Sequence, residues 1–425
     1  MRKTFQSYVF GCRVNEAERI KMDKELVEAG FSVDLASPSF LIINTCAITG
    51  KAEREAKQLV YQLRKRHPQA KIVLTGCSAT FWQKYHSEGP ALGDITVPND
   101  KKSSLVSLLA SLSGPLATSQ VHTANTDKFR HSNRLLVKIQ DGCQRYCSYC
   151  IVPYLRGLPQ SQSIKSIVAY INSFHPIPSE VVVSAINTEA FGVDSGETLI
   201  NLIQAILTDT QVPRLAFGSI HPWSLTDEFI EYYRTKLSKE LRFIHFFHVP
   251  IQSGSQTMLK HMRRDYAISD VIHKLNAIQR IHPGALIATD IIVGFLKETQ
   301  DLFRETYTLL KASPINRFHV FKFSNRPHTA AYYKKGQLKE PTPEMKKEWS
   351  KKLIALSTDK YQRFLKSQIG KASEALVISN DADESKILLD NHEEGVILGK
   401  QCLPGELVHV TIIGAKDGKV ICKES

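Results

Sequence analysis

The sequence has no apolar run that is long enough to cross a membrane. Its 425 residues are 42% hydrophobic and 23% charged, which is ordinary for a folded soluble protein. No stretch approaches the roughly 18 uninterrupted apolar residues of a transmembrane helix. Glu16 and Glu18 follow the basic N-terminal residues too soon for a signal peptide. We therefore expect a cytoplasmic protein without a membrane partner.

A fourth cysteine is missing from the densest cysteine cluster. The segment DGCQRYCSYCIVPYLRG, residues 141–157, contains Cys143, Cys147 and Cys150, whereas structural zinc sites and most iron–sulfur clusters have four ligands. Three thiolates can hold three irons of a four-iron cluster and leave the fourth iron open, as radical chemistry with S-adenosylmethionine (SAM) requires. A zinc knuckle without its fourth ligand is the alternative interpretation.

Acidic residues are fewer than basic ones. The 55 Lys and Arg against 42 Asp and Glu give a formal net charge of +13, which favours an anionic partner, most commonly nucleic acid. A merely basic soluble protein is the alternative. The charge is uneven, because residues 371–425 hold six Lys and no Arg against ten Asp and Glu. Attraction to nucleic acid would therefore come from the rest of the chain.

The first hundred residues alternate buried strands with helices. The segments TFQSYVFGC, FLIINTC and KIVLTGC are typical of buried strands, and helical patterns separate them. This order predicts an α/β domain with an open parallel sheet in residues 1–125. Cys12, Cys46 and Cys77 each follow one of these strands. Since the ends of parallel strands share one edge, we expect the three thiols to converge; three unrelated buried cysteines are the alternative.

Two further domains are expected after residue 125. From LLVKIQDGC onward, strands and helices alternate again, and this succession predicts a full or partial (β/α) barrel in residues 126–362, with its site at the C-terminal ends of the strands. The final segment, residues 363–425, contains short strands separated by Gly, Asp and Asn, which predict a small antiparallel β-barrel.

Seven segments resemble, in order and spacing, the motifs of the radical-SAM methylthiotransferases over essentially the whole chain. They are GCRVNEAE at 11–18, INTCAITGKAERE at 43–55, LTGCSA at 74–79, DGCQRYCSYCIVPYLRG at 141–157, HVPIQSGSQTMLKHMRR at 248–264, TDIIVGF at 289–295 and FKFSNRPHT at 321–329. The resemblance implies SAM as cofactor, a radical-SAM partial barrel and a C-terminal TRAM barrel that helps to bind RNA. It also implies two 4Fe–4S clusters, held by Cys12, Cys46 and Cys77 and by Cys143, Cys147 and Cys150.

Five other residues are candidates for binding SAM or balancing charge. Tyr149 is expected near the adenine of SAM, and the resemblance places Asn187, Gln252 and Ser253 on the SAM side of the barrel. A polar turn after a strand is the alternative for the last two. Arg156 is expected to balance the charge of a cluster or of the SAM carboxylate, and a solvated arginine is the alternative.

The segment NTCAITGKAERE looks most like the branch of the family that acts on N6-threonylcarbamoyladenosine. This implies transfer of a methylthio group to C2 of that nucleoside, beside the anticodon of tRNA. Two alternative reactions are methylthiolation of isopentenyladenosine in tRNA and methylthiolation of an aspartate in a ribosomal protein. The acidic C-terminal barrel favours the protein substrate. A third alternative is a noncatalytic RNA-binding iron–sulfur protein. We expect a monomer and an electron donor such as flavodoxin or ferredoxin.

Two pairs of residues depart from the family pattern. Ser184-Ala185 stand where the family usually has Thr-Gly, and Leu296-Lys297 stand where it usually has Pro-Gly. Both pairs are expected in loops near the cofactor or the edge of the barrel, so they place the fine geometry of the cofactor in doubt. All six cysteine positions are retained.

Overall fold

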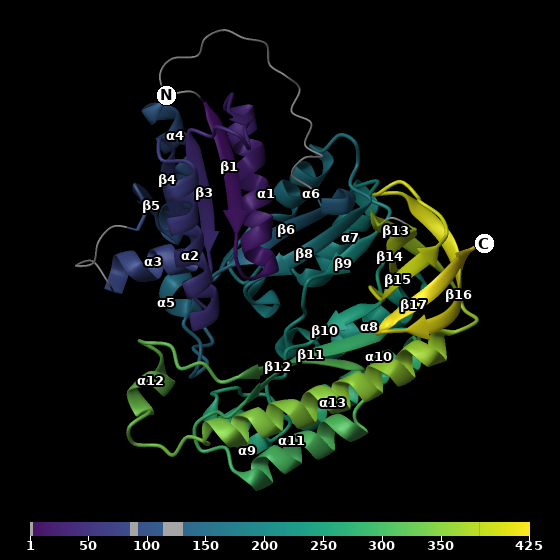
Figure 1. The fold of residues 1–425 in the computed structure, drawn as a ribbon. Coiled ribbons are helices and arrows are strands. Elements are labelled where there is room, and N and C mark those ends of the chain that lie inside the picture. Colours follow the sequence, from purple (N-terminus) through teal and green to yellow (C-terminus); the bar gives the residue numbers. More distant parts are fainter. Residues whose placement is uncertain (1–2, 86–91, 114–130, 382) are drawn as a thin grey trace.

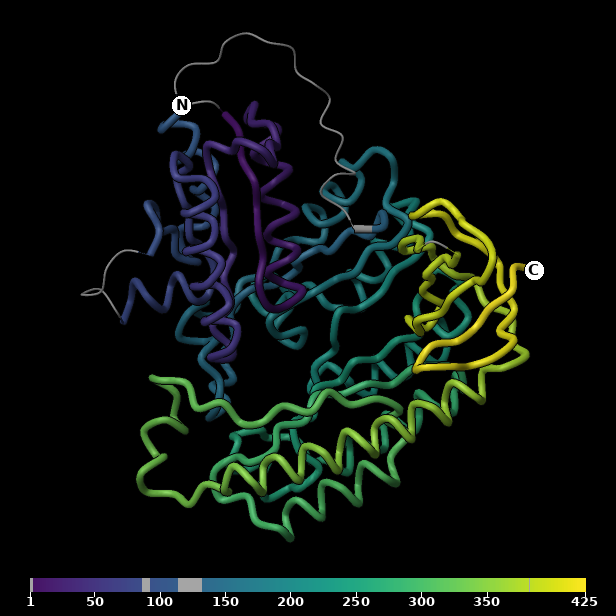
Figure 2. The backbone as a smooth tube through the Cα atoms, viewed as in Figure 1, coloured from purple at the N-terminus to yellow at the C-terminus, as the bar shows by residue number. Residues whose placement is uncertain are grey.

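The computed structural model describes residues 3–85, 92–113, 131–381 and 383–425. An N-terminal α/β domain lies beside a central partial barrel, and a small closed β-barrel packs at the far end of the partial barrel (Figure 1). Figure 2 traces the same path, in which the long helix that follows the central strands leads to the closed barrel. The predicted α/β class and its three architectures are confirmed.

The N-terminal domain is a parallel sheet with helices on both faces. Its strand order is β2-β1-β3-β4-β5, and the apolar strand β3 is buried along its whole length, as a central parallel strand should be. Helices α2 and α3 cover one face, while α1 and α4 cover the other. The elements are β1 (Thr4–Val9), α1 (Arg13–Glu28), β2 (Ser32–Val33), β3 (Phe40–Thr45), α2 (Gly50–Arg66), β4 (Lys71–Thr75), α3 (Gly76–Tyr85), β5 (Ile95–Val97) and α4 (Leu105–Leu112).

The central domain is a barrel that does not close. Two sheets, β7-β6-β8-β9 and β10-β11-β12, are joined by a bridge between Leu215 and Phe243. Apart from the short β7, every strand pair is parallel. The elements are β6 (Arg134–Asp141), α5 (Val152–Arg156), β7 (Gln160–Ser161), α6 (Ile164–Asn172), β8 (Glu180–Ala185), α7 (Leu199–Asp209), β9 (Leu215–Phe217), α8 (Asp227–Thr235), β10 (Phe246–His248), α9 (Gln256–His261), α10 (Ile268–Ile281), β11 (Leu286–Val293), α11 (Gln300–Ala312), β12 (Arg317–Lys322), α12 (Ala330–Lys334) and α13 (Pro343–Gln368).

The N-terminal domain is packed tightly against the partial barrel. Helix α1 lies between its own sheet and strands β6 and β8, and Ile20 of α1 belongs to the barrel core. In the opposite direction, Ile151 and Leu155 leave the barrel and pack into the core of the N-terminal domain. Because each domain buries apolar side chains of the other in its core, the two domains are held in a fixed arrangement with their strand ends facing each other.

The C-terminal barrel closes in the order β13-β14-β15-β17-β16. Its pairs are antiparallel except for β15 with β17, which run parallel. A buried ion cluster fixes it to the partial barrel: Glu180, at the start of β8, accepts hydrogen bonds from Arg214 at 3.1 Å and His392 at 3.0 Å. The strands are β13 (Ala372–Asp381), β14 (Glu384–Leu389), β15 (Glu394–Leu398), β16 (Leu407–Lys416) and β17 (Lys419–Glu424).

Helix α13 connects the partial barrel to the closed barrel (Figure 1). It runs through the predicted boundary at residues 362–363, and β13 begins only at Ala372. The other predicted boundary, at residues 125–126, lies outside the described residues, so the exact division stays a prediction. Neither α13 nor any other helix of the described ranges combines the length and apolar character needed to span a bilayer.

Candidate active site

The three N-terminal cysteines follow three neighbouring strands of the parallel sheet. Cys12 caps α1 after β1, Cys46 directly follows β3, and Cys77 is the second residue of α3, after β4. Each thiol lies close enough to the other two for their charges to interact. Residues separated by three strands and two helices in sequence are therefore brought together by the sheet edge.

Two glycines make this close approach feasible. Gly11 has a φ of +96°, and a Cβ atom there would lie 2.5 Å from Sγ of Cys46. Gly76 has a φ of +89°, and a Cβ atom there would lie 2.5 Å from Oδ1 of Asn44. Any side chain at either position would therefore combine left-handed backbone strain with a collision beside a cysteine.

The second cysteine set lies in a single loop between β6 and α5. The backbone N–H of Cys143 donates to Gly157 at 3.0 Å, and that of Cys150 donates to Cys147 at 2.9 Å, so the loop is closed by its own hydrogen bonds. The charges of all three thiols interact with one another. The loop is also held from outside, because the N–H and the hydroxyl of Ser148 donate to the carbonyls of Met262 at 3.0 Å and His261 at 2.8 Å. The three ligands of this set are nevertheless neighbours in sequence.

The thiols lie in apolar surroundings that oppose the thiolate form. Burial raises the pKa of Cys12 and Cys143, raises the pKa of Cys46 to about 12, and raises that of Cys150 as well. A positively charged iron centre supplies the compensation that such buried thiolates need. No three His, Cys, Asp or Glu of the described ranges converge on a single ion, but the thiolates of a four-iron cluster bind different irons. The donor chemistry therefore fits two iron–sulfur clusters.

One cavity of about 550 Å³ lies between the two domains and is lined by both cysteine sets. The N-terminal domain contributes two of its three cysteines, and the barrel loop contributes all of its own. Strand ends of the partial barrel form the remaining wall, as the position of a (β/α) site predicts. The thiols that line the cavity are those of Cys12, Cys46, Cys143, Cys147 and Cys150.

Three of the predicted SAM-side residues line this cavity, and one does not. Tyr149, Asn187 and Gln252 lie in its wall. Oδ1 of Asn187 is buried without a hydrogen-bond partner among the described residues, so it can accept a bond from a ligand donor. Ser253 instead lies behind the wall, where its hydroxyl is 3.1 Å from that of Thr306 on α11.

Arg264 is a cavity residue that the sequence reasoning did not single out. It is buried and donates to the hydroxyl of Tyr149 at 3.1 Å and to the carbonyl of Pro250 at 2.9 Å. Its guanidinium carbon lies 4.6 Å from the ring centroid of Trp223, which Arg145 also approaches, at 4.2 Å. The repeated basic residues of KHMRR were the only indication in the sequence.

His221 is a second residue that the sequence reasoning missed. Burial, together with the nearby Arg264, lowers its pKa to about 3. Its Nδ1 atom accepts a hydrogen bond from the backbone N–H of Thr188 at 3.2 Å, so the neutral ring carries its proton on Nε2. It therefore adds an uncharged donor to the cavity wall.

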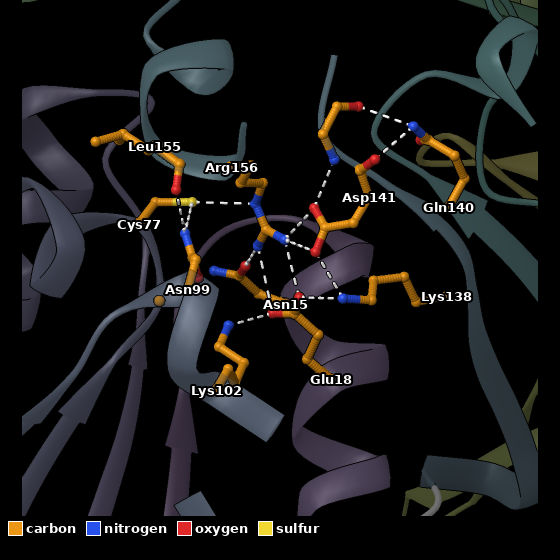
Figure 3. A network of polar contacts seen from close by, with 12 residues as sticks. Asn15, Glu18, Cys77, Asn99, Lys102, Lys138, Gln140, Asp141, Leu155 and Arg156 are labelled. Atoms are coloured by element: carbon orange, nitrogen blue, oxygen red, sulfur yellow. Dashed lines mark hydrogen bonds and ion pairs between the residues drawn. The ribbon is translucent and has the colours of Figure 1, made fainter. Parts of the chain in front are cut away.

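Arg156 lies outside this cavity, in a buried network between the two domains (Figure 3). Its side chain is 1% exposed, so the alternative of a solvated arginine is wrong. It donates to Glu18 and Asp141 at 2.8 Å each and to Asn15 at 2.7 Å. Burial alone would raise the pKa of Glu18. The positive charges of Arg156 and of two lysines outweigh this effect and hold the pKa of Glu18 well below its usual value.

A second contact holds the domains together at the end of β12. Arg326, in the segment after that strand, donates to Glu53 of α2 at 2.7 Å. Glu53 also accepts a hydrogen bond from Trp82 at 2.7 Å. Two residues beyond Arg326, the ring of His328 stacks on Tyr85 with centroids 3.7 Å apart. The cavity therefore lies between two fixed contacts of the N-terminal domain with the barrel.

Comparisons with known proteins identify both domains. Residues 4–93 match the model described as "Uncharacterized protein family UPF0004", and residues 137–310 match that of the Radical SAM superfamily. The threonylcarbamoyladenosine tRNA methylthiotransferase MtaB of Thermotoga maritima is 31% identical over 88% of this chain and 86% of its own length. The chain belongs to the radical-SAM methylthiotransferase family. Members of this family use SAM and two 4Fe–4S clusters.

Two further comparisons concern a second relative and a solved structure. The tRNA-2-methylthio-N(6)-dimethylallyladenosine synthase of Lawsonia intracellularis is 28% identical over 77% of each chain. The radical SAM methyltransferase TsrM of Kitasatospora setae superposes with a TM-score of 0.55 at 12% identity, covering 78% of this chain and 77% of that one. The likeness to TsrM shows the fold alone, and it supports the partial barrel.

The two departures from the family pattern lie in different surroundings. Ser184 and Ala185 are the last two residues of strand β8, so the expectation of a loop is wrong for this pair. Ala185 lines the cavity, so the absence of glycine there alters the wall itself. Ser184 is buried behind it, and its hydroxyl has no partner among the described residues. Leu296 and Lys297 lie in a turn, and Lys297, at the position where the family pattern has glycine, has a φ of +65°, in the left-handed region that favours glycine.

Proposed function

We propose that the protein adds a methylthio group to C2 of N6-threonylcarbamoyladenosine beside the anticodon of tRNA. The first support is the family, whose relative in Thermotoga maritima carries that substrate in its name. The second is the net charge of +13, which suits an RNA substrate. A TRAM-like C-terminal barrel that helps to bind the RNA, and an electron donor such as flavodoxin or ferredoxin, complete the proposal.

The shared cavity is the observation that carries this proposal. A cluster on Cys143, Cys147 and Cys150 and a second one on Cys12, Cys46 and Cys77 would both face it, and both would have an iron without a protein ligand. When bound, the clusters and SAM supply a 5′-deoxyadenosyl radical and the sulfur to be transferred. A noncatalytic iron–sulfur protein has no need for two open sites that face each other.

The residues of the cavity wall would hold and orient SAM. Asn187 offers its free carbonyl oxygen, and Tyr149 is fixed by its bond from Arg264. Gln252 is held with a φ of +67°, and its own N–H and C=O bond to Asp290 and Ile292 of β11 at 2.9 Å each. These groups are rigid before any ligand binds, which reduces the free energy lost in ordering the cofactor.

Iron analysis after anaerobic reconstitution tests the assignment of the clusters. We expect about eight irons per chain in the wild type and about four in the C12A/C46A/C77A variant, which should still cleave SAM to 5′-deoxyadenosine. The C143A/C147A/C150A variant should also retain about four irons but lose SAM cleavage. As the matched control, C402A/C422A removes two buried cysteines of the closed barrel and should leave about eight irons. An unchanged iron content in either triple variant contradicts the assignment.

Mass spectrometry of tRNA nucleosides separates the candidate substrates. In a strain that lacks the gene, we expect loss of the 2-methylthio form of N6-threonylcarbamoyladenosine, with the unmethylthiolated nucleoside remaining. Loss of the 2-methylthio form of isopentenyladenosine instead would assign the other tRNA branch. Unchanged tRNA together with an unmodified aspartate in a ribosomal protein would assign the protein substrate.

A further inference from the structure

Arg156 touches one sulfur of the N-terminal cysteine set. Its Nε donates toward Sγ of Cys77 at 3.3 Å, whereas its Nη atoms are occupied by Asn15, Glu18 and Asp141. Figure 3 shows the guanidinium lying between the sulfur on one side and the two carboxylates on the other. All three guanidinium nitrogens are thus bonded, and the orientation of the Nε–H toward sulfur is fixed.

The network around Arg156 has an excess of positive charge. Lys102 bonds to Glu18 at 2.5 Å, and Lys138 bonds to Glu18 at 2.8 Å and to Asp141 at 2.7 Å. Three cations therefore face two carboxylates, which leaves one net positive charge beside the sulfur of Cys77. A cavity of about 940 Å³ is lined by the same charged residues, and Cys77 is not among its lining residues.

Arg156 also joins the segments that carry the two cysteine sets. It ends the helix that follows Cys150, and its partner Asp141 lies two residues before Cys143. Its other partners, Asn15 and Glu18, lie on α1, which begins directly after Cys12. One side chain therefore ties together the strand end, both loops and the helix that set the separation of the two sites.

The barrel loop has a corresponding arginine with a weaker contact. Arg264 lies 3.8 Å from Sγ of Cys147, but its nitrogens also bond to Tyr149, Tyr266 and Pro250. Hydrogen bonds to sulfur, net charge and solvent exposure set the reduction potential of an iron–sulfur cluster. The hydrogen bond from Arg156 to Cys77 and the net positive charge of its network both stabilise the reduced form of an N-terminal cluster, because that form carries one more negative charge.

We propose that Arg156 is a positioning residue that raises the reduction potential of the cluster on Cys12, Cys46 and Cys77 and fixes that cluster relative to the barrel loop. The inference rests on the proposed function, because it requires a cluster on these three cysteines. It names the one side chain whose removal should change the redox behaviour of this cluster while all its ligands remain.

A redox titration of the N-terminal cluster tests this role. The full chain carrying C143A/C147A/C150A is reconstituted, so that a single cluster contributes to the electron paramagnetic resonance signal. With R156Q added, we expect a more negative midpoint, with the ratio of reduced to oxidised cluster at the parent midpoint about tenfold lower. R156K keeps the charge with a shorter reach and should recover part of the shift. R264Q is the matched control and should leave this midpoint unchanged.

The variant D141N gives a shift of opposite sign. Asparagine still accepts a bond from Arg156 but removes one negative charge, so the midpoint should become more positive. A merely structural role would not give opposite signs for R156Q and D141N. An unchanged midpoint in R156Q with about four irons bound overturns the proposal. If R156Q binds no iron, the proposal is overturned by an unchanged midpoint potential in D141N.

The titration is distinct from the test of the cluster assignment. If C12A/C46A/C77A leaves the iron content at about eight, the proposed second cluster itself is wrong, and the role of Arg156 falls with it. If that variant loses about four irons but neither R156Q nor D141N changes the midpoint potential, only the role of Arg156 is overturned.

Discussion

The two cysteine sets line one cavity but are brought together in different ways. Cys143, Cys147 and Cys150 lie within eight residues of one loop, whereas Cys12, Cys46 and Cys77 come from three strands of a sheet. The first set is closed by hydrogen bonds inside its own loop. The second set exists only when β1, β3 and β4 are aligned. A local site is thus combined with one that depends on the tertiary fold.

This difference decides which changes each set should tolerate. The barrel loop requires its own turns and the contacts of Ser148 with His261 and Met262, and its ligands are neighbours in sequence. The N-terminal set requires correct register of three strands and glycine at the points where their loops approach. Folding of the whole sheet is therefore a condition for the second cluster but not for the first.

The largest effect is expected when a methyl group is placed between two of the N-terminal loops. G11A puts a Cβ atom 2.5 Å from Sγ of Cys46, so we expect about four irons instead of about eight, with SAM cleavage retained. The matched control G196A has the same sign of φ, +76°, and nothing within 4 Å of the added atom. It should keep about eight irons. Iron analysis and a 5′-deoxyadenosine assay measure both results.

The reciprocal change should affect the other set. A Cβ atom at Gly142 would collide with the carbonyl of Leu158, beside Cys143. G142A should therefore lose the barrel cluster and SAM cleavage while about four irons remain on the N-terminal set. If G11A and G142A had the same effect on SAM cleavage, the two sets would not be assembled independently.

A smaller effect is expected when the sets are intact but less well aligned. R326M removes the bond to Glu53 that ties the segment after β12 to α2. We expect about eight irons and SAM cleavage within about twofold of the wild type, but about tenfold slower methylthio transfer, because misplacement of reacting groups by an ångström is costly. R304M is the control, because it removes an exposed arginine whose one ion pair within the described residues is with Asp301 at 3.4 Å. Equal transfer rates in R326M and wild type would show that this contact does not set the alignment.

The sequence predicted the local site better than the assembled one. The cysteine spacing in residues 141–157 needed no fold, and the apolar strands placed the other cysteines at one sheet edge. The partners of Arg156 and Arg264 were not predictable, because these arginines meet cysteines 79 and 117 residues away. Motif position likewise gave the turn at Gln252 and Ser253 but not the direction in which each side chain points.

On the barrel side, a pH effect on stability is expected at Glu298. Glu298 lies in the turn that supports Phe295, whose ring contacts Tyr149 with centroids 6.3 Å apart. Burial raises its pKa to about 7, although the N–H groups of Gly294 and Phe295 lower it. Since the folded state binds this proton more tightly, stability is full below pH about 4.5 and falls as the pH rises toward 7.

Thermal unfolding at pH 6 and pH 8 measures this effect. We expect the wild type to lose about 1 kcal/mol more than E298Q between these values, because glutamine still accepts a bond but does not ionise. Both variants should keep the same iron content at pH 8. Parallel pH profiles for the two proteins would mean that Glu298 is already ionised at pH 6.

The smallest effect is expected at Lys297, the departure next to Glu298. Its φ of +65° is held by a bond from its N–H to the carbonyl of Lys339 at 2.8 Å, so the turn imposes a backbone conformation that lysine disfavours. K297G removes this strain of about 1 kcal/mol, but glycine loses more backbone freedom on folding. We therefore expect a gain in unfolding free energy of less than about 1 kcal/mol, with SAM cleavage unchanged. K335G, at the C-cap of α12 where φ and ψ are helical, should instead destabilise. A loss of stability in K297G would show that the turn carries no strain.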